Sequence, residues 1–263
     1  MFVDSHTHLD EFSPTAIPSI LNRAHEAGIR LIITAGTTLL SCKDVVRLIN
    51  QHDMIYGGVG LHPMNLQGFP TEEDYLSLTK LIASNTKIIT MSEIGLDFTE
   101  TSPPKELQEQ VFREQLRLAS QLKLPIVFHC RNAYKEIITI LKEEDAGKYG
   151  GIFHYFQGDL FTAEAAIDLG FYISIAKPIL RLPELQSTAT TIPLSNMVLE
   201  TDCAPQPWKK HRKNWTEPYH IVDIAMKLAE IKNTELANVA STTTSNILSI
   251  FGERLDGIAI KAS

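Results

Sequence analysis

The sequence predicts an α/β protein folded as a (β/α)8 barrel, the fold also called a TIM barrel. Strand-like runs alternate with helix-like segments along the chain, and there are roughly eight such runs within 263 residues. The runs are almost continuously apolar, which is typical of parallel strands that are covered by helices. An open doubly wound sheet is the alternative that this pattern allows.

Each expected strand is a short run rich in β-branched residues. In chain order the runs are FVDSH, RLIITAG, IYGGVGL, KIITMSEIGL, PIVFHC, GGIFHYF, FYISIA and NMVLETD. Between them, residues 105–123 place apolar side chains on one stripe with a period of 3.6 residues, after two prolines that mark a helix start: Leu107, Val111, Leu118 and Leu122. Residues 217–231 show the same helical pattern, with Ile221, Ile224, Ala225, Leu228 and Ile231.

Composition limits the class of protein. A content of 44% hydrophobic and 21% charged residues is ordinary for a soluble globular protein, and we expect disorder only at residues 261–263. No linker, repeat or low-complexity tract divides the chain, so residues 1–263 are expected to form a single domain. No apolar run approaches the roughly 18 residues of a spanning helix, and strand-like sequence follows Met1 directly. These features predict a cytoplasmic protein without a membrane partner, and we expect a monomer.

Charge and cysteine content exclude further classes. The formal net charge of −7 argues against bulk attraction to nucleic acid or anionic lipid, so a polyanionic substrate would have to be bound locally. Three cysteines without a framework spacing, Cys42, Cys130 and Cys203, indicate reduced thiols in a cytosol. A nucleophilic or soft-metal role for any of them is not expected, because none belongs to a Cys-x-x-Cys pair.

The N-terminal run MFVDSHTHLD contains two histidines two residues apart. In a strand, Asp4, His6 and His8 would share one face, because successive side chains point to opposite sides. A single such pair is often only a surface feature. Polar residues at the ends of the other expected strands decide between the two interpretations.

Side chains that can bind metal recur at the C-terminal ends of the expected strands, which all open on one face of a parallel barrel. Together with the histidine pair, they form a set of nitrogen and oxygen ligands suited to zinc, manganese, magnesium or iron: His6, His8, Glu93, His129, His154 and Asp202. Each buried ionisable group costs several kcal/mol unless it is paired or bound to metal. The set as a whole therefore predicts a metal site.

The motifs SHTHLD, GLHP, SEIGLD, PIVFHCRNA, FHYFQGD and LETDCAP follow one another over essentially the whole chain. In this order they resemble the TatD family of metal-dependent deoxyribonucleases, within the amidohydrolase-like barrels. The resemblance implies a TIM barrel of the metal-dependent hydrolase type with two divalent ions (Zn, Mg or Mn). It also implies a role for each ligand: His6, His8 and Asp202 hold one ion, His129 and His154 hold the other, and Glu93 bridges them. His62 would lie near the substrate without binding metal.

The chain departs from the family pattern in three places. Asn132 follows Arg131 where relatives often carry aspartate, the segment after LETDCAP is longer and rearranged, and a basic residue usually found after SEIGLD and its aromatic is missing. The metal ligands are unaffected by these changes. The departures bear on substrate preference, and Arg131 is expected to contact the substrate.

The expected chemistry is hydrolysis by activated water. Two ions about 3.5 to 4 Å apart can share a hydroxide and clamp the oxygens of a phosphodiester, so no protein nucleophile is needed. Asp202 would both bind metal and accept the proton of the attacking water, and Glu93 would be the second catalytic residue.

Residues 207–215, PWKKHRKNW, form the one basic run with flanking aromatics. Its cations are expected to neutralise phosphates while its tryptophans stack on unpaired bases: Lys209, Lys210, Arg212 and Lys213. The equally acceptable alternative is a solvated loop whose tryptophans cap the barrel.

The functional hypothesis is a deoxyribonuclease, with an exonuclease as one form of it, acting on DNA that is single-stranded or has frayed ends. A binuclear amidohydrolase-type hydrolase of a small amide, lactone or ester is the second hypothesis. The third is a metal-stabilised protein that binds nucleic acid or joins a complex without catalysis. The basic run favours the first over the second, and the complete ligand set disfavours the third. Metal identity and strand polarity stay open.

Overall fold

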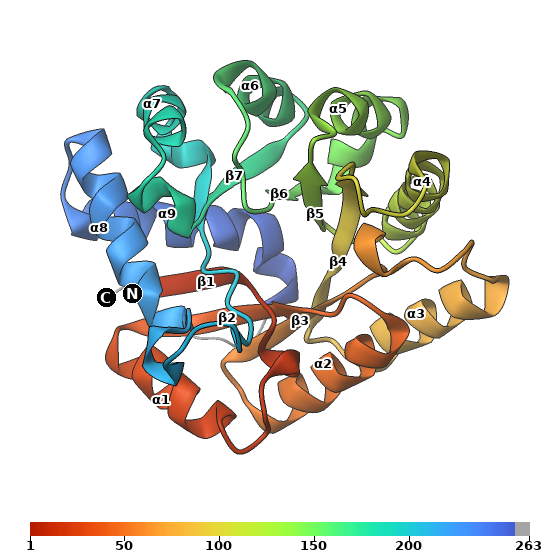
Figure 1. The fold of residues 1–263 in the computed structure, drawn as a ribbon, viewed down its shortest axis with the longest axis horizontal. Coiled ribbons are helices and arrows are strands. Elements are labelled where there is room, and N and C mark those ends of the chain that lie inside the picture. Colours follow the sequence, from red (N-terminus) through yellow and green to blue (C-terminus); the bar gives the residue numbers. More distant parts are fainter. Residues whose placement is uncertain (256–263) are drawn as a thin grey trace.

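Eight parallel strands form one sheet in which every strand pairs with the next one along the chain (Figure 1). The computed structural model describes residues 1–255. The strands are β1 (Phe2–Thr7), β2 (Ile29–Ala35), β3 (Ile55–Val59), β4 (Ile88–Asp97), β5 (Ile126–Arg131), β6 (Gly151–Phe153), β7 (Phe171–Ile175) and β8 (Met197–Leu199). A parallel bridge between Thr7 and Cys203 brings β1 beside the segment after β8, so the sheet is a nearly closed barrel. The predicted (β/α)8 fold is confirmed.

Helices surround the barrel on the outside (Figure 1). They are α1 (Ile17–Glu26), α2 (Leu39–Gln51), α3 (Glu72–Ser84), α4 (Lys105–Gln121), α5 (Tyr134–Glu143), α6 (Leu160–Asp168), α7 (Pro183–Thr191), α8 (Ile221–Lys232) and α9 (Leu236–Phe251). The helices predicted over residues 105–123 and 217–231 correspond to α4 and α8. In the second case the 3₁₀ turn Pro218–His220 replaces the first predicted turn.

Two threonines fix where helices begin after the loops at the C-terminal end of the barrel. Thr38 Oγ1 accepts a hydrogen bond from Ser41 N at 3.1 Å, and Thr71 Oγ1 accepts one from Asp74 N at 3.3 Å. In both cases the third residue of the helix also caps the threonine backbone. Such reciprocal caps satisfy amide groups that a helix start leaves unpaired, so α2 and α3 have defined entry points.

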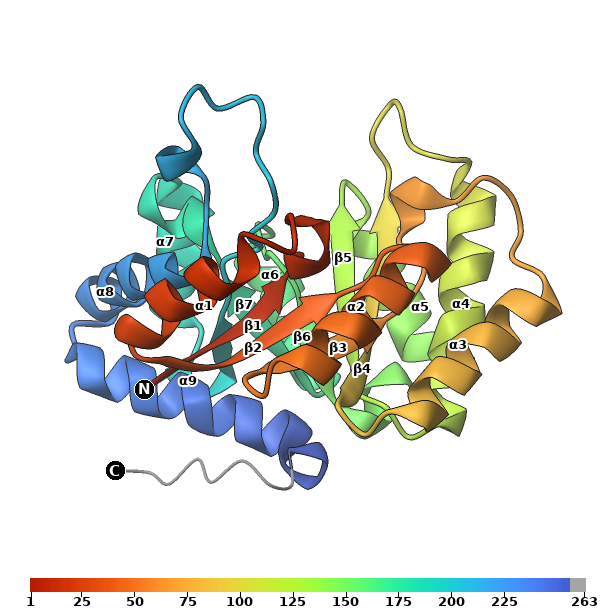
Figure 2. The same cartoon turned by 90° about the horizontal axis from the view of Figure 1, so that it is seen from below.

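The last helix, α9, covers the end of the barrel where the strands begin. Its residues Ile247 and Phe251 join a buried cluster with strand residues that include Val3, Leu31 and Val127. Asn246 Nδ2 donates to the carbonyl of Met197, at the start of β8. Figure 2 shows α9 on one side of the barrel and the long loop after β8 on the other. Within the described residues, α9 therefore covers the end where the strands begin and leaves the end with the strand C-termini uncovered.

Two further expectations concern the C-terminal tail and membrane-spanning helices. The tail predicted to be disordered, residues 261–263, lies outside the described residues. Within residues 1–255, none of the helices combines the length and apolar character that crossing a membrane requires.

Candidate metal centre

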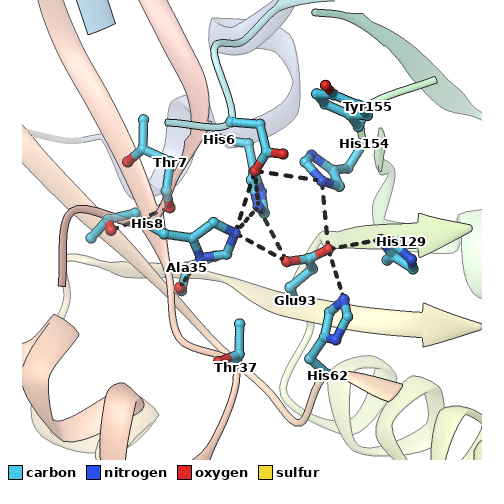
Figure 3. A network of polar contacts seen from close by, with 12 residues as sticks. His6, Thr7, His8, Ala35, Thr37, His62, Glu93, His129, His154 and Tyr155 are labelled. Atoms are coloured by element: carbon cyan, nitrogen blue, oxygen red, sulfur yellow. Dashed lines mark hydrogen bonds and ion pairs between the residues drawn. The ribbon is translucent and has the colours of Figure 1, made fainter. Parts of the chain in front are cut away.

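The structure brings all six predicted ligands together at the C-terminal end of the barrel; Figure 3 labels His6, His8, Glu93, His129 and His154, and Asp202 lies 3.4 Å from His8 Nε2 through its Oδ1. They come from five strands or the residues just after them, namely His6 and His8 from β1, Glu93 from β4, His129 from β5, His154 after β6 and Asp202 after β8. Figure 3 shows Glu93 at the middle of the group, with imidazoles around it. Parallel strands place their ends on one face, which is why residues so distant in sequence meet here.

One oxygen of Glu93 faces the histidine pair of β1. Glu93 Oε2 lies 3.4 Å from His6 Nε2 and 3.3 Å from His8 Nε2. The two imidazole nitrogens are themselves only 3.4 Å apart, and Asp202 Oδ1 lies 3.4 Å from His8 Nε2. Four ligand atoms thus converge on one small space.

The other oxygen of Glu93 faces a second group of imidazoles. Glu93 Oε1 lies 3.3 Å from His62 Nε2, 3.2 Å from His129 Nδ1 and 3.5 Å from His154 Nε2. Glu93 therefore has a separate set of possible ligands on each of its two oxygens. This is the arrangement required of a carboxylate that bridges two ions.

A glycine in β4 permits this close approach. Gly95 has a φ of +143°, and a Cβ atom on it would lie 2.0 Å from the carbonyl oxygen of His129. Any other residue would force β4 and β5 apart, because this φ and this distance are both accessible only to glycine. Gly95 therefore sets the distance between Glu93 and His129.

Hydrogen bonds on the far side of three imidazoles fix which nitrogen faces Glu93 with a lone pair. A carbonyl or carboxylate oxygen only accepts, so His8 Nδ1 donates to the Ala35 carbonyl at 3.1 Å. For the same reason His129 Nε2 donates to Asp97 Oδ2 at 2.9 Å. The opposite nitrogens, His8 Nε2 and His129 Nδ1, are left free to bind metal, as in the carboxylate–histidine–metal arrangement of known sites.

His154 is oriented in the same way by a fully buried carboxylate, Glu200. His154 Nδ1 donates to Glu200 Oε2 at 3.0 Å, which leaves Nε2 facing Glu93. Glu200 also accepts hydrogen bonds from the Tyr155 amide and the Ser174 hydroxyl, each at 2.6 Å. With all of these donors the carboxylate is held in one orientation, and it holds the ring of His154 in turn.

His62 differs from these three histidines. Its Nδ1 accepts a hydrogen bond from the Met64 amide at 3.2 Å, so the neutral ring carries its proton on Nε2. Burial lowers the pKa of His62, which keeps the ring neutral. Nε2 therefore donates to Glu93 and has no lone pair for a metal ion. This geometry supports the expected role near the substrate, which stays a prediction.

The electrostatics of the centre favour cations. Burial opposes ionisation of Glu93, but His62, His154 and further imidazole contacts outweigh it and hold its pKa well below the usual value. The pKa of Asp202 is lowered against the same effect of burial, mainly by its hydrogen bond with His8. Burial also opposes protonation of His154, yet Glu200 and Glu93 raise its pKa to about 9. Without a metal ion, protons supply the positive charge that the buried carboxylates demand.

The donor set fits divalent metal ions. Among the described residues, two groups without His62 have all of their ligand atoms within 4.8 Å of one another: His6, His8 and Glu93; His6, His154 and Asp202. His62, Glu93 and His129 meet the same distance limit, although the His62 tautomer leaves it no lone pair for metal. Nitrogen and carboxylate ligands of this kind suit zinc, manganese or iron, and magnesium to a lesser degree. His6 Nδ1 is buried without a hydrogen-bond partner among the described residues, so its tautomer is free to suit a ligand at Nε2.

The predicted substrate contacts are placed differently from one another. Arg131 is 58% exposed at the end of β5, with Nε 3.7 Å from Asp97 Oδ2. In the loop after β8, Lys210 and Lys213 are exposed, and Lys209 Nζ donates to the Asn214 carbonyl at 3.0 Å. These four cations are available to a substrate, and their phosphate contacts stay predictions.

Arg212, the remaining predicted cation of the loop after β8, has partners within the protein. Its Nη1 lies 2.8 Å from Glu217 Oε1, and its guanidinium lies over the rings of Trp215 and Phe12, at 4.4 Å and 5.3 Å. Trp215 therefore supports the loop from within the protein, as expected from the alternative in which the tryptophans cap the barrel. Trp208, with 76% of its surface exposed, stays free to stack on a base.

Several functional side chains were missed by sequence reasoning. Asp97 and Glu200, which orient His129 and His154, lie inside the motifs SEIGLD and LETD, and an acidic residue within an apolar strand is the signal that could have found them. Asp4 does not join the centre. It is buried and accepts hydrogen bonds from the amide and hydroxyl of Thr201, tying β1 to β8.

The cysteines take no visible part in the chemistry. All three are free thiols, and Cys42 and Cys203 are fully buried. Burial raises the pKa of Cys130 to about 12, so its thiol stays protonated. A protonated thiol is a poor nucleophile, and water as the nucleophile stays a prediction.

A TIM barrel that gathers histidines and carboxylates from five strands at its open end defines the class of metal-dependent hydrolases. A sequence model of one family in this class, described as TatD related DNase, matches residues 3–252. The chain belongs to the TatD family.

Individual relatives agree with this assignment. YabD of Bacillus subtilis, described as an uncharacterized metal-dependent hydrolase, is 32% identical over 95% of this chain and 99% of its own length. The protein of Shigella flexneri named 3'-5' ssDNA/RNA exonuclease TatD is 29% identical over 89% of this chain and 92% of its own. The crystal structure of YjjV, a TatD homologue from Escherichia coli K12, covers 95% of this chain and 98% of its own with a TM-score of 0.87 and 27% identity.

Proposed function

We propose that this hydrolase is a nuclease that cleaves phosphodiester bonds of single-stranded DNA, working from a strand end. The observation that carries the proposal is the centre around Glu93, with a set of possible ligands on each carboxylate oxygen and cations at its mouth. The Shigella relative named as an ssDNA/RNA exonuclease supports the choice of substrate.

The centre is proposed to hold two divalent ions, zinc, magnesium or manganese. His6, His8 and Asp202 would hold one and His129 and His154 the other, with Glu93 between them. Such ions, when bound, lower the pKa of water and neutralise charge on phosphate oxygens. Glu93, 3% exposed, is too deeply buried to meet the substrate and serves as the bridge.

Asp202 is the proposed proton acceptor. Its side chain is 27% exposed, so it is the carboxylate of the centre that water can reach. Its lowered pKa keeps it ionised at neutral pH, as a base must be. With substrate bound, the Nε2–H group of His62, which contacts Glu93 in this structure, would instead donate a hydrogen bond to an oxygen of the phosphodiester.

The cations at the mouth are proposed to bind phosphates along the strand: Arg131, Lys209, Lys210 and Lys213. Each contact releases counterions, so binding should weaken as salt increases. Neither a small amide nor an ester requires such a series of cations. This feature favours the nuclease over the small-molecule hydrolase.

The test is an activity panel with the purified protein and Zn, Mg or Mn. Substrates are single-stranded DNA labelled at either end, duplex DNA, RNA and p-nitrophenyl esters, and Glu93→Ala is the inactive control. We expect cleavage of single-stranded DNA that Glu93→Ala abolishes. Ester turnover without DNA cleavage would support the small-molecule hydrolase, and DNA binding without any turnover would support the non-catalytic alternative.

A further inference from the structure

A cavity of about 450 Å³ lies directly beside the metal centre, between the connections that follow β2 and β3. His62 lines this cavity while its Nε2 contacts Glu93, so one residue belongs to both spaces. Thr37, which accepts a hydrogen bond from the His62 amide at 3.0 Å, also lines it, and Figure 3 shows the two residues side by side at the edge of the centre. A group bound in the cavity would therefore adjoin whatever reacts at the centre.

The lining combines apolar side chains with neutral polar ones such as Thr37 and Asn65. Leu40 and Phe69 are 72% and 57% exposed, and large apolar side chains are seldom left uncovered next to a catalytic centre without use. Among the described residues that line the cavity, none is a lysine or arginine. Asp74 brings the one carboxylate among these lining residues, and its Oδ2 accepts hydrogen bonds from the amide and hydroxyl of Thr71 at 2.7 Å and 2.8 Å. The cavity thus suits an uncharged ring with a polar edge.

Positive charge gathers on the opposite side of the mouth. We call this group the basic rim: Arg131 at the end of β5, Lys177 and Arg181 after β7, and Lys209 after β8. The charges of Arg131 and Arg181 both act on Tyr155, next to His154, and the charge of Lys209 acts on Lys177. In a ring of eight strands the gap between β2 and β3 lies across from β6 and β7, so the cavity and the basic rim flank the centre.

We propose that this cavity binds the terminal nucleobase of a nucleic-acid strand whose last phosphodiester lies at the metal centre. The inference rests on the proposed nuclease function. Phe69 stacks on the base, Leu40 packs against it, and the side-chain amide of Asn65 meets its polar edge. The rest of the strand leaves across the basic rim. The volume lies within the range of about 300 to 1,000 Å³ that is usual for small-molecule sites.

The experiment first identifies the end that is degraded and then compares two oligonucleotides that differ only there, one with a base and one with an abasic terminal sugar. Base stacking on an aromatic side chain changes affinity by roughly 5- to 150-fold. The wild type should prefer the strand with the terminal base by such a factor, mainly through KM. Phe69→Ala should bring the preference close to one and leave cleavage of the abasic strand unchanged. Met226→Ala, at an exposed apolar residue of α8, is the matched control and should keep the preference.

A second readout needs no cleavage. A strand with 2-aminopurine at the same terminus is titrated with chelator-treated protein, and stacking in the cavity should quench its fluorescence with the wild type but not with Phe69→Ala. Quenching that depends on Phe69 in a protein that cuts no DNA would overturn the nuclease and uphold the cavity. DNA cleavage with no preference for a terminal base would refute the proposal that the cavity binds this base. A preference and quenching that survive Phe69→Ala would refute it as well.

Discussion

Replacing Asp97 with asparagine should weaken one metal site and spare the other. Asp97 is buried, and its Oδ1 accepts hydrogen bonds from the amide and hydroxyl of Thr99 at 3.1 Å and 2.8 Å. An asparagine must keep its oxygen on this side, because the backbone amide can only donate. Its NH2 group then faces His129 Nε2, where Asp97 Oδ2 lies at 2.9 Å.

This reversal moves a proton onto the metal-binding nitrogen. Facing a donor, His129 Nε2 has to accept, so the neutral ring carries its proton on Nδ1, which is 3.2 Å from Glu93 Oε1. Loss of a carboxylate that orients a ligating histidine typically costs about 10- to 100-fold in metal affinity, or about 1.4 to 2.7 kcal/mol. The ion that His6, His8 and Asp202 are proposed to hold should be unaffected.

The assay is a competition titration against a chromophoric chelator, which resolves two affinities per chain. Asp97→Asn should raise one dissociation constant by about 10- to 100-fold and leave the other as in the wild type. Ser102→Ala is the matched control, since it removes a hydrogen bond to Asp97 Oδ1 at 2.9 Å without touching the His129 contact. Wild-type affinity at both sites in Asp97→Asn, or an equal loss at both, would refute the tautomer argument.

Three further predictions concern other parts of the molecule. Glu93→Ala removes the proposed bridge, so it should lower activity by more than the roughly 100-fold that is lost when a residue orienting a metal ligand is replaced. It should also bring bound metal below two ions per chain, as elemental analysis would show. Replacing Lys209, Lys210 and Lys213 together with alanine should lower the salt dependence of DNA binding by up to about 0.7 per lost contact and spare a small chromogenic phosphodiester. Glu144→Gln should cost about 1 kcal/mol or less of unfolding free energy at pH 7, measured with urea, because two arginines of α4 pair with this carboxylate.

The last of these effects depends on pH with a definite sign. Hydrogen bonds from Arg117 lower the pKa of Glu144 below its ordinary 4.5. The pairing therefore stabilises the protein above about pH 4.5 and fades as pH falls through the lower pKa of the folded state. The difference between Glu144→Gln and the wild type should be smaller at pH 4 than at pH 7, and a difference that does not shrink would contradict the argument. Glu164→Gln, at an exposed residue of α6, serves as the control at both pH values.

The controls for the other two predictions separate folding from function. Glu93→Ala should keep the circular dichroism spectrum of the wild type, and full activity in this variant would remove Glu93 from the mechanism. Equal loss on DNA and on the small phosphodiester in the triple lysine variant would show that the loop supports the barrel mouth instead of binding phosphate.

The fold and the position of the ligands could be predicted because both follow from local patterns. Parallel strands buried on both faces read as apolar runs, and a glutamate or histidine at the end of such a run is conspicuous, as with Glu93 and His129. The orienting roles of Asp97 and Glu200 could not be predicted, since they depend on which nitrogen of a distant imidazole lies within hydrogen-bond distance.

Arg212 is a second case in which long-range contacts could not be predicted from the sequence. Its surroundings in the basic run predicted a phosphate contact, and nothing local indicated that Glu217 and Phe12 would bind its side chain. Phe12 lies two hundred positions earlier in the chain, and only closure of the barrel brings it near. Charge runs therefore predict that cations are present, while the three-dimensional pairing decides which of them are free.

The hydrogen bonds on the far side of the imidazoles also determine which rings can face a cation and which ring can face an anion. In their neutral forms His8, His129 and His154 would present lone pairs toward Glu93, whereas neutral His62 presents an N–H group, because its other nitrogen accepts from a backbone amide. Lone pairs favour cations, and an N–H favours an anionic oxygen. His62 is also the wall shared with the neighbouring cavity. Under the proposed function, a phosphodiester whose oxygen met this N–H would have one of its two nucleosides at the cavity, and the tautomer of a single histidine would link the choice of strand end to the bond that is cut.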